Sequence, residues 1–221
     1  MRWTVWTLFF FASFFSTSFG YCSPTMKVAL EVVRGEHALS LTEAKSLFAE
    51  MQIRFKDELG VELVRYSIRA RRNPFRGLVQ LENRLKIFYK WWYFFNRRYS
   101  DKSILHLALI PPLVGDYGDR KMFFIVGYAA GVCPMKFHRL GVSYVAATSF
   151  SEVGLPRFMH SLFATMHELG HLLGASHDEA LPASLMNPDI GKFLLAGFSE
   201  LRFSARSVSD IQACLGKKQS S

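Results

Sequence analysis

The sequence predicts an α/β fold in which helices pack on a mixed, mostly parallel sheet. Strand-like apolar segments alternate with amphipathic helical segments along most of the chain, an order typical of such a sheet. The length of 221 residues suits one domain with a sizeable core, and no linker interrupts it. Because 50% of the residues are hydrophobic and 20% are charged, a globular protein is expected.

The N-terminus is expected to be a targeting segment outside the fold. Residues 1–20 begin with one Arg and continue as an apolar run broken by small polar residues. Ser18 and Gly20 satisfy the small-residue rule for a signal peptidase, which predicts cleavage before Tyr21 and a secreted, extracellular protein. The alternative is an uncleaved signal anchor, although the run is short and polar for a membrane span. Lipidation of Cys22 is disfavoured, because Tyr21 stands where a lipoprotein signal requires a small residue.

The first elements of the folded domain are a strand, a helix and a second strand. Residues 26–35 are mostly apolar and partly β-branched, and residues 61–71 alternate in polarity, so both are expected to be strands. Residues 40–60 form an amphipathic helical pattern. Ser40, with a glutamate three positions on, can cap this helix, and Gly60 ends it.

A basic and very aromatic helix is expected at residues 78–99. We favour a buried helix whose Lys and Arg side chains extend to solvent. The alternative is a contact surface for a membrane or a protein partner.

The remaining elements lead to the C-terminus. An interior strand should be nearly continuously apolar, a proline favours the first turn of a helix, and serine and aspartate favour a helix cap. These signals predict strands at 103–113, 122–132 and 141–149, a helix from Pro156 through His171, and a last helix from Ser207, capped with Asp210, to Gly216. The folded domain is therefore expected at 24–216, with a basic and polar tail at 217–221.

The net charge gives only a general indication of partners. Lys and Arg number 27 against 18 acidic residues, a formal charge of +9. This balance is compatible with acidic partners, but a basic solvated surface is the simpler interpretation. The sequence has no Gly-rich phosphate loop, nucleic-acid signature or internal repeat, so no nucleic-acid partner is expected.

The stretch HELGHLLGASHD, residues 167–178, has the spacing of a metal centre. His167 and His171 lie one helical turn apart on the same face, so both can bind one ion. Gly174 can adopt a left-handed conformation that ends the helix, which lets His177 return as a third ligand. Three protein ligands leave one position open for water, the arrangement of a catalytic zinc site.

Glu168 supplies the acid–base group of this stretch. It is rotated by roughly 100° from His167, so it can stand beside the ion without binding it. There it can take a proton from the zinc-bound water and pass it to a leaving amine. The alternative is a surface helix with solvated histidines, which the added glycine and third histidine make improbable. His160 lies on the same face; it is interpreted as a core-edge or cleft-wall residue, and the alternative is a second metal ligand. The other histidines lack ligand spacing: His37, His106 and His138.

Three cysteines suggest one disulfide. Cys22 falls at the processed end, whereas Cys133 and Cys214 lie in the folded domain. Export implies an oxidising compartment, so the simplest pairing joins Cys133 to Cys214. Closing so long a loop contributes about 4 kcal/mol in the chain-entropy model. Cys22 would be a free thiol, an intermolecular partner or a residue without a role.

The histidine stretch resembles HExxHxxGxxH, the extended motif of the metzincin zinc metalloproteases. Asp178 follows the third histidine, which is most similar to the adamalysin (reprolysin) group that includes the ADAM proteases. SLMNP resembles the family's Met-turn, which implies that Met186 lies in a tight turn beneath the zinc. Taken alone, Met186 would be interpreted as core packing. Asp178 is expected to anchor the turn after the third ligand.

The resemblance covers most of residues 26–215 and implies a metzincin-like zincin fold. It implies a shallow cleft between a larger N-terminal lobe and a small C-terminal subdomain that carries the Met-turn. The active-site helix, His167 to His171, would form the floor of this cleft. GYAAGVCP resembles the family's edge strand with the cysteine after it, and FSARSVSDIQACL resembles the closing segment with the partner cysteine. A substrate peptide would extend along the edge strand, here about Phe124–Val132. The implied substrate-binding residues are Tyr128, Ala129, Ala130, Gly131 and Pro188.

The sequence departs from the family in its calcium ligands and additional cysteines. Ala205 stands where a cysteine is common, and none lies near Met186. Ala29 stands near the usual acidic calcium ligand, with Glu31 two positions on. After the last cysteine the chain has lysines instead of a neutral ligand, so calcium is not predicted; these residues are Lys217 and Lys218.

These observations predict a secreted endopeptidase with one catalytic Zn²⁺, bound by His167, His171 and His177, and with Glu168 as the general base. Its partners would be peptides or proteins in extended conformation. The alternative is an exported protein-binding module on a zinc-containing metzincin scaffold, with little proteolysis. Glu168 counts against this alternative, because a scaffold has no chemical need for it.

Overall fold

The computed structural model describes the strands, the helices and the segment after the histidine helix. The described residues are 23–35, 38–72, 104–110, 114–117, 120–123, 128–130, 140–144, 157–188 and 201–219, with Lys90, Tyr93, Phe94, Arg97 and Asp101. The elements are β1 (Thr25–Arg34), α1 (Leu41–Leu59), β2 (Glu62–Arg72), β3 (Ile104–Ile110), β4 (Val114–Tyr117), β5 (Arg120–Phe123), β6 (Tyr128–Ala130), β7 (Leu140–Tyr144), α3 (Arg157–Leu172) and α5 (Ala205–Gln219).

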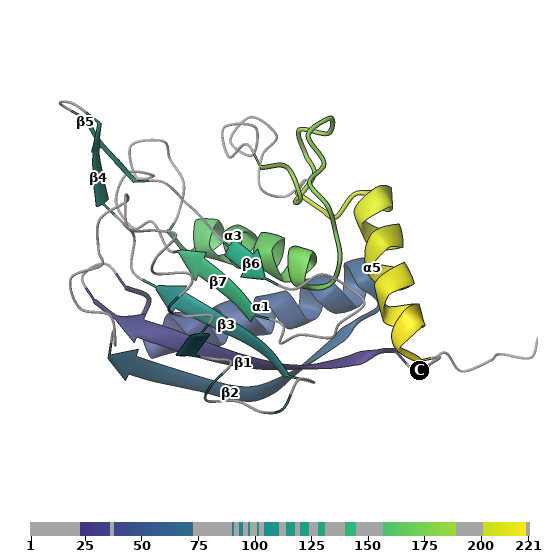
Figure 1. Cartoon of the computed structure of the whole chain (residues 1–221), viewed down its shortest axis with the longest axis horizontal. Coiled ribbons are helices and arrows are strands. Elements are labelled where there is room, and N and C mark those ends of the chain that lie inside the picture. The colour runs from purple at the N-terminus through teal and green to yellow at the C-terminus, as the bar shows by residue number, and fades with distance from the viewer. Residues whose placement is uncertain are drawn as a thin grey trace, which may run out of the picture.

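A five-stranded sheet in the order β2-β1-β3-β7-β6 forms the centre of the molecule (Figure 1). β2, β1, β3 and β7 are parallel, and β6 pairs antiparallel with β7 at one edge. This confirms the expected mixed, mostly parallel sheet. All seven residues of β3 are buried, as its continuous apolar run predicted.

The expectation of one strand at 122–132 is wrong. Met122 and Phe123 belong to β5, which pairs antiparallel with β4 in a separate two-stranded sheet. β6 begins later, at Tyr128. The Gly118–Asp119 pair lies before this segment, between β4 and β5, and is a hairpin signal that would have indicated that Met122 and Phe123 pair with the preceding strand.

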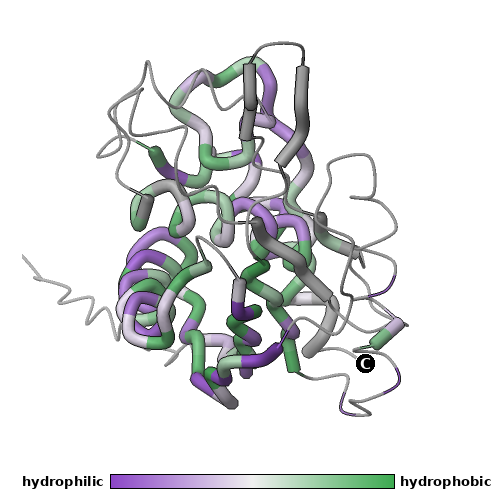
Figure 2. Tube along the Cα trace, turned by 90° about the vertical axis from the view of Figure 1, so that its left-hand side faces the viewer, coloured by the Kyte–Doolittle hydropathy of each residue, from purple (hydrophilic) through white to green (hydrophobic). Residues whose placement is uncertain are grey.

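α1 and α3 lie on the same face of the sheet (Figure 1). Ser40 caps α1 in a complete capping box, and Gly60 ends it with a left-handed φ of 67°, as predicted. Leu47, Met51 and Phe55 are fully buried on the inner face of α1. Figure 2 shows hydrophobic and hydrophilic residues alternating along this helix, as in an amphipathic helix packed on a sheet.

α5 begins earlier and ends later than predicted. Ser204 is its N-terminal cap: the Ser204 Oγ accepts a hydrogen bond from the Ser207 N–H at 3.1 Å. This acceptor starts the helix one turn before the expected cap at Ser207. Gly216 lies inside the helix, because a glycine costs only about 1 kcal/mol there and does not by itself end a helix. The expected tail at 217–221 is therefore helical through Gln219.

Several predictions lie outside the described residues. They concern the signal segment 1–20, Cys22, Cys133, Gly131, His37, His138 and most of residues 78–99. The described residues of this last segment, Lys90, Tyr93, Phe94 and Arg97, are helical. Among the helices that the structure describes, none has the length and apolar character needed to cross a membrane.

Candidate metal centre

The three histidines predicted as ligands converge. His167 and His171 lie on α3, and their Nε2 atoms are 3.1 Å apart. His177, beyond the helix end, places its Nε2 atom 3.0 Å from that of His171. His167 and His171 are half-buried and His177 is exposed, so the cluster opens toward solvent. Within the described residues, this is the one group of side chains arranged to hold a metal ion.

Backbone carbonyls determine the tautomers of the two helical histidines. The His167 Nδ1 lies 2.8 Å from the Leu185 carbonyl, and the His171 Nδ1 lies 2.8 Å from the Ala175 carbonyl. Because a carbonyl only accepts, each Nδ1 must carry the proton and donate it. In the neutral rings, each Nε2 atom then carries a lone pair and no proton. The two Nε2 atoms, 3.1 Å apart, therefore cannot form a hydrogen bond with one another. Converging lone pairs of this kind fit a cation between them.

The spacing of these nitrogen atoms fits zinc. Tetrahedral Zn²⁺ with Zn–N bonds of about 2.0–2.1 Å places two ligand nitrogens about 3.3 Å apart. The separations of 3.1 and 3.0 Å are close to this value. The donor set of three imidazoles is also one that catalytic zinc sites use.

The helix end that returns His177 to the centre is a Schellman turn at Gly174. Gly174 has a φ of 99°, in the left-handed region. The Ala175 N–H donates to the Gly170 carbonyl at 3.0 Å, and the Gly174 N–H donates to the His171 carbonyl at 2.9 Å. The same turn places the Ala175 carbonyl that accepts from His171. Gly174 thus both turns the chain and fixes the orientation of the His171 ring.

A tight turn at Ser184–Asn187 lies against α3 and supports the histidine cluster. Besides the Leu185 carbonyl, the Met186 carbonyl accepts from the Asp178 N–H at 3.0 Å, directly after His177. The turn is held internally, because the Met186 N–H donates to the Ser184 Oγ and the buried Asn187 N–H donates to the Ser184 carbonyl. The backbone of Asp178 therefore anchors the chain after the third ligand; its Oδ2 has no hydrogen-bond partner among the described residues.

The side chain of Met186 is fully buried against α3 at Gly170. A Cβ on Gly170 would lie 2.6 Å from the Met186 Sδ and 2.9 Å from the Phe203 Cε1. Both contacts are too short, so any larger residue would force the buried Met186 and Phe203 side chains to shift.

Replacing Gly170 by alanine is expected to destabilise the protein. Overpacking costs about 1–3 kcal/mol, of which the better helix propensity of alanine recovers about 1 kcal/mol. Urea denaturation of the metal-free protein measures the difference. Gly216→Ala is the matched control: it is also helical, and a Cβ there meets nothing within 4 Å, so it should be neutral or stabilising. Equal losses in the two variants would contradict the role assigned to Gly170.

Burial shifts the pKa values of the central groups. Burial, reinforced by His171, lowers the pKa of His167 from 6.5 to about 3. Burial likewise lowers the pKa of His171. Both rings are therefore neutral at physiological pH, the form that binds metals. Glu168 is 5% exposed on α3, and burial raises its pKa from 4.5 to about 8. A carboxyl of this kind can both accept and donate a proton near neutrality.

The other predicted site residues lie at the sheet edge and beside the turn. Tyr128, Ala129 and Ala130 form β6, the edge strand next to β7. Pro188 is exposed directly after Asn187. Cys214 is buried and disulfide-bonded; since Cys133 is outside the described residues, its pairing with Cys214 stays a prediction. The side chain of His160 on α3 is also outside the described residues.

The carboxylate of Glu31, two positions after Ala29 on β1, is bound by an arginine. The Arg71 Nε and Nη2 donate to the two Glu31 carboxylate oxygens at 2.8 and 3.1 Å. His106 is 1% exposed within β3, far along the chain from the other histidines and not part of their cluster.

No family model matches the sequence, and no curated protein matches it. The fold, however, is similar to solved structures. Metalloproteinase-II from Bacteroides fragilis matches with a TM-score of 0.54 and 16% identity, over 87% of this chain and 53% of that chain. Archaemetzincin from Methanopyrus kandleri matches with a TM-score of 0.53 and 17% identity, over 89% of this chain and 98% of that chain. This chain thus spans about half the length of the Bacteroides protein. At these identities, the likeness concerns the fold.

Proposed function

We propose that the protein is a zinc-dependent endopeptidase that hydrolyses peptide bonds with a metal-activated water. The observation that carries the proposal is that the His171 Nε2 lies 3.1 and 3.0 Å from the Nε2 atoms of His167 and His177, with both helical rings held in the metal-binding tautomer. A structural zinc would be closed by a fourth protein ligand. The described cluster instead has three ligands and an adjacent buried Glu168. The metalloproteinase named among the similar folds supports the same function.

Glu168 performs the proton transfers of the reaction. When bound, zinc would polarise the scissile carbonyl and lower the pKa of its water to about 7. Glu168 takes one proton from this water as the oxygen attacks the carbonyl carbon. Its buried carboxyl holds the proton, because burial favours the neutral form. As the C–N bond breaks, Glu168 donates the proton to the leaving nitrogen, and no covalent enzyme intermediate is needed.

The substrate is proposed to extend along β6. β6 pairs with β7 on one side, and no strand pairs with its other side among the described residues. An extended peptide can therefore add to this edge by β-augmentation, with Tyr128, Ala129 and Ala130 supplying backbone donors and acceptors. α3 contacts both β6 and β7, which places this edge beside the histidine helix.

Within the zinc peptidases we propose an adamalysin-like member. The supporting residues are Asp178 after the third ligand and Met186, buried against α3, as the Met-turn. Secretion through residues 1–20 and the disulfide between Cys133 and Cys214 belong to the same proposal, since both fit an oxidising compartment.

Cleavage of a peptide library tests the function. The purified protein should cleave internal peptide bonds, lose this activity with a zinc chelator and regain it with Zn²⁺. Zinc binding without any cleavage would contradict the peptidase and favour the alternative of a binding module.

The stability of the metal-free protein should depend on pH through Glu168. The folded state keeps the Glu168 proton up to a pKa of about 8, whereas the unfolded state releases it near 4.5. Stability from this group is therefore lost as pH rises, by about 2 kcal/mol between pH 6.5 and 8. His167 acts oppositely: its stability contribution is lost as pH falls from 6.5 toward about 3. Urea titrations in chelator at pH 6.5 and 8 should show the loss in the wild type and not in Glu168→Gln.

A further inference from the structure

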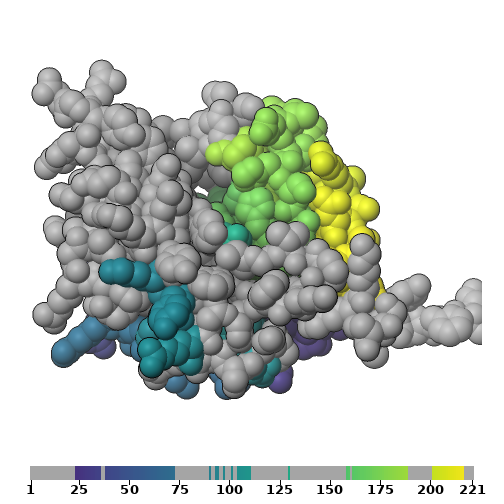
Figure 3. Space-filling model, in the orientation of Figure 1, coloured from purple at the N-terminus to yellow at the C-terminus, as the bar shows by residue number. Residues whose placement is uncertain are grey.

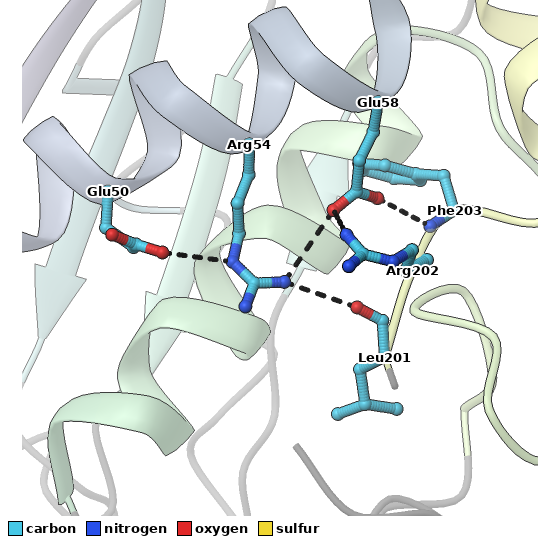
Figure 4. A network of polar contacts seen from close by, with 6 residues as sticks. All are labelled: Glu50, Arg54, Glu58, Leu201, Arg202 and Phe203. Carbon is cyan, nitrogen blue, oxygen red and sulfur yellow. Dashed lines mark hydrogen bonds and ion pairs between the residues drawn. The ribbon is translucent and has the colours of Figure 1, made fainter. Parts of the chain in front are cut away.

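A polar cluster outside the metal centre joins α1 to residues 201–203 (Figure 4). The Glu58 side chain is 7% exposed. Its Oε2 accepts from the Phe203 N–H at 3.0 Å, and its Oε1 accepts from the Arg202 Nη1 at 3.3 Å. Arg54, one turn earlier on α1, lies 3.6 Å from the same Oε1 and donates to the Leu201 carbonyl at 3.3 Å. One carboxylate and one guanidinium thus hold three consecutive residues.

Residues 201–203 pair with the turn at Ser184–Asn187, which supports the metal centre. Ser184 and Arg202 form a parallel bridge: the Leu185 N–H donates to the Arg202 carbonyl at 2.7 Å, and the Arg202 N–H donates to the Ala183 carbonyl at 3.3 Å. Figure 3 shows residues 161–188 and 201–216 lying against each other on one side of the molecule. Any displacement of Arg202 therefore reaches Leu185.

Leu185 connects residues 201–203 to His167. Its carbonyl accepts from the His167 Nδ1 at 2.8 Å and so sets the ring's tautomer and orientation. A parallel apolar route runs through Phe203, whose ring contacts Phe55 edge-on at 5.5 Å and closely approaches Gly170. Arg54 also lies 5.2 Å above the ring of Phe163, one turn before His167 on α3.

The charge of a buried carboxylate must be balanced by hydrogen bonds or cations. The Glu58 carboxylate obtains part of this balance from the Phe203 backbone N–H. An ion pair between Glu58 and Arg54 would by itself need neither Phe203 nor Arg202. The bond to the Phe203 N–H, in contrast, fixes the position of the chain itself. The Glu58 carboxylate therefore acts on the backbone segment that pairs with Leu185, whose carbonyl holds His167. Glu58 and His167 are 109 residues apart in the sequence.

We propose that Glu58 is a positioning residue for the zinc centre, acting through residues 201–203 and Leu185 on His167. This inference rests on the proposed zinc function, but it assigns a role to a helix that has no metal ligand. Removing the Glu58 carboxylate releases the Phe203 N–H and the Arg202 side chain. The Leu185 carbonyl then loses its fixed position, and His167 binds zinc less tightly.

Zinc affinity in competition with a chelator tests the proposal. Glu58→Ala should weaken zinc binding about tenfold, the lower range for partners that orient a ligand. Glu58→Gln keeps an oxygen for the Phe203 N–H and should recover most of the affinity. The matched control is Glu50→Gln, which also removes a carboxylate bound to Arg54, at 3.2 Å on the same helix. Unlike Glu58, Glu50 makes no hydrogen bond or ion pair with the described residues 201–203. Its zinc affinity should stay within about twofold of the wild type.

A second measurement separates positioning from simple destabilisation and does not need zinc. In the metal-free protein, long-range proton–nitrogen NMR spectra report the tautomer of His167, and exchange of its Nδ1 proton reports the bond to Leu185. Glu58→Ala should accelerate this exchange, and Glu50→Gln should not. Unchanged exchange and unchanged zinc affinity in Glu58→Ala would overturn the inference, even if the variant melts earlier. If Glu58→Ala does not fold, the same two readings on Glu58→Gln decide, with a smaller shift expected in the same direction.

The failure of the inference and that of the proposed function have different signatures. Wild-type protein that binds zinc and cleaves peptides, with Glu58 variants unchanged, contradicts only the role of Glu58. Wild-type protein that binds no zinc contradicts the proposed function, and the metal-free exchange of the His167 Nδ1 proton still decides whether Glu58 positions this ring.

Discussion

Glu168→Gln is expected to abolish peptide hydrolysis while leaving zinc in place. The amide has nearly the shape of the carboxyl but cannot accept the proton of the attacking water. General acid–base catalysis contributes about 10²–10⁴-fold, and kcat/KM should fall at least by this factor. Initial rates on a peptide cleaved by the wild type measure the loss.

Zinc content of the same samples is the control for this prediction, since Glu168 is not among the three clustered ligands. Glu179→Gln, an exposed acid in the segment after Asp178, is a matched variant that should remain active. A fully active Glu168→Gln protein with a full complement of zinc would contradict the assignment of the general base.

His177→Ala is expected to remove most zinc binding and, with it, the activity. His177 is the exposed ligand, so its loss disturbs the core less than the loss of His167 or His171. Removing a residue that only hydrogen-bonds to a metal ligand lowers metal affinity by about 10- to 100-fold. Removing the ligand itself should therefore lower zinc affinity by more than about 100-fold. Competition with a chelator measures this loss.

Ser176→Ala is the matched control for His177→Ala, because Ser176 is exposed and adjacent in the chain. It should bind zinc like the wild type. If the His177→Ala variant also retained wild-type affinity, His177 would not be a ligand, and the three-histidine centre would be wrong.

Signals within short segments made much of the fold predictable. The capping box at Ser40, the left-handed Gly60 and the buried run of β3 each act through neighbouring residues. The β4–β5 hairpin was missed because the apolar run at 122–132 has the pattern of one strand. The cap at Ser204 was missed because Ser207 and Asp210 form a second capping pattern three residues later.

The ligands of the centre were predictable, but its supports were not. Ligand spacing on a helix is a property of side-chain types, so His167, His171 and His177 could be named from the sequence. The carbonyls of Ala175 and Leu185 act through the backbone, which every residue has, so no sequence pattern indicates them. The contact of Glu58 with Phe203 likewise depends on the tertiary fold.

X-ray absorption at the zinc edge of the purified protein tests the central claim most directly. The account predicts one zinc per chain with three imidazole nitrogens at about 2.0–2.1 Å, one further oxygen and no sulfur. The imidazole signal should weaken in His177→Ala. A sulfur ligand, or a protein that holds no zinc while it cleaves peptides, would contradict the account.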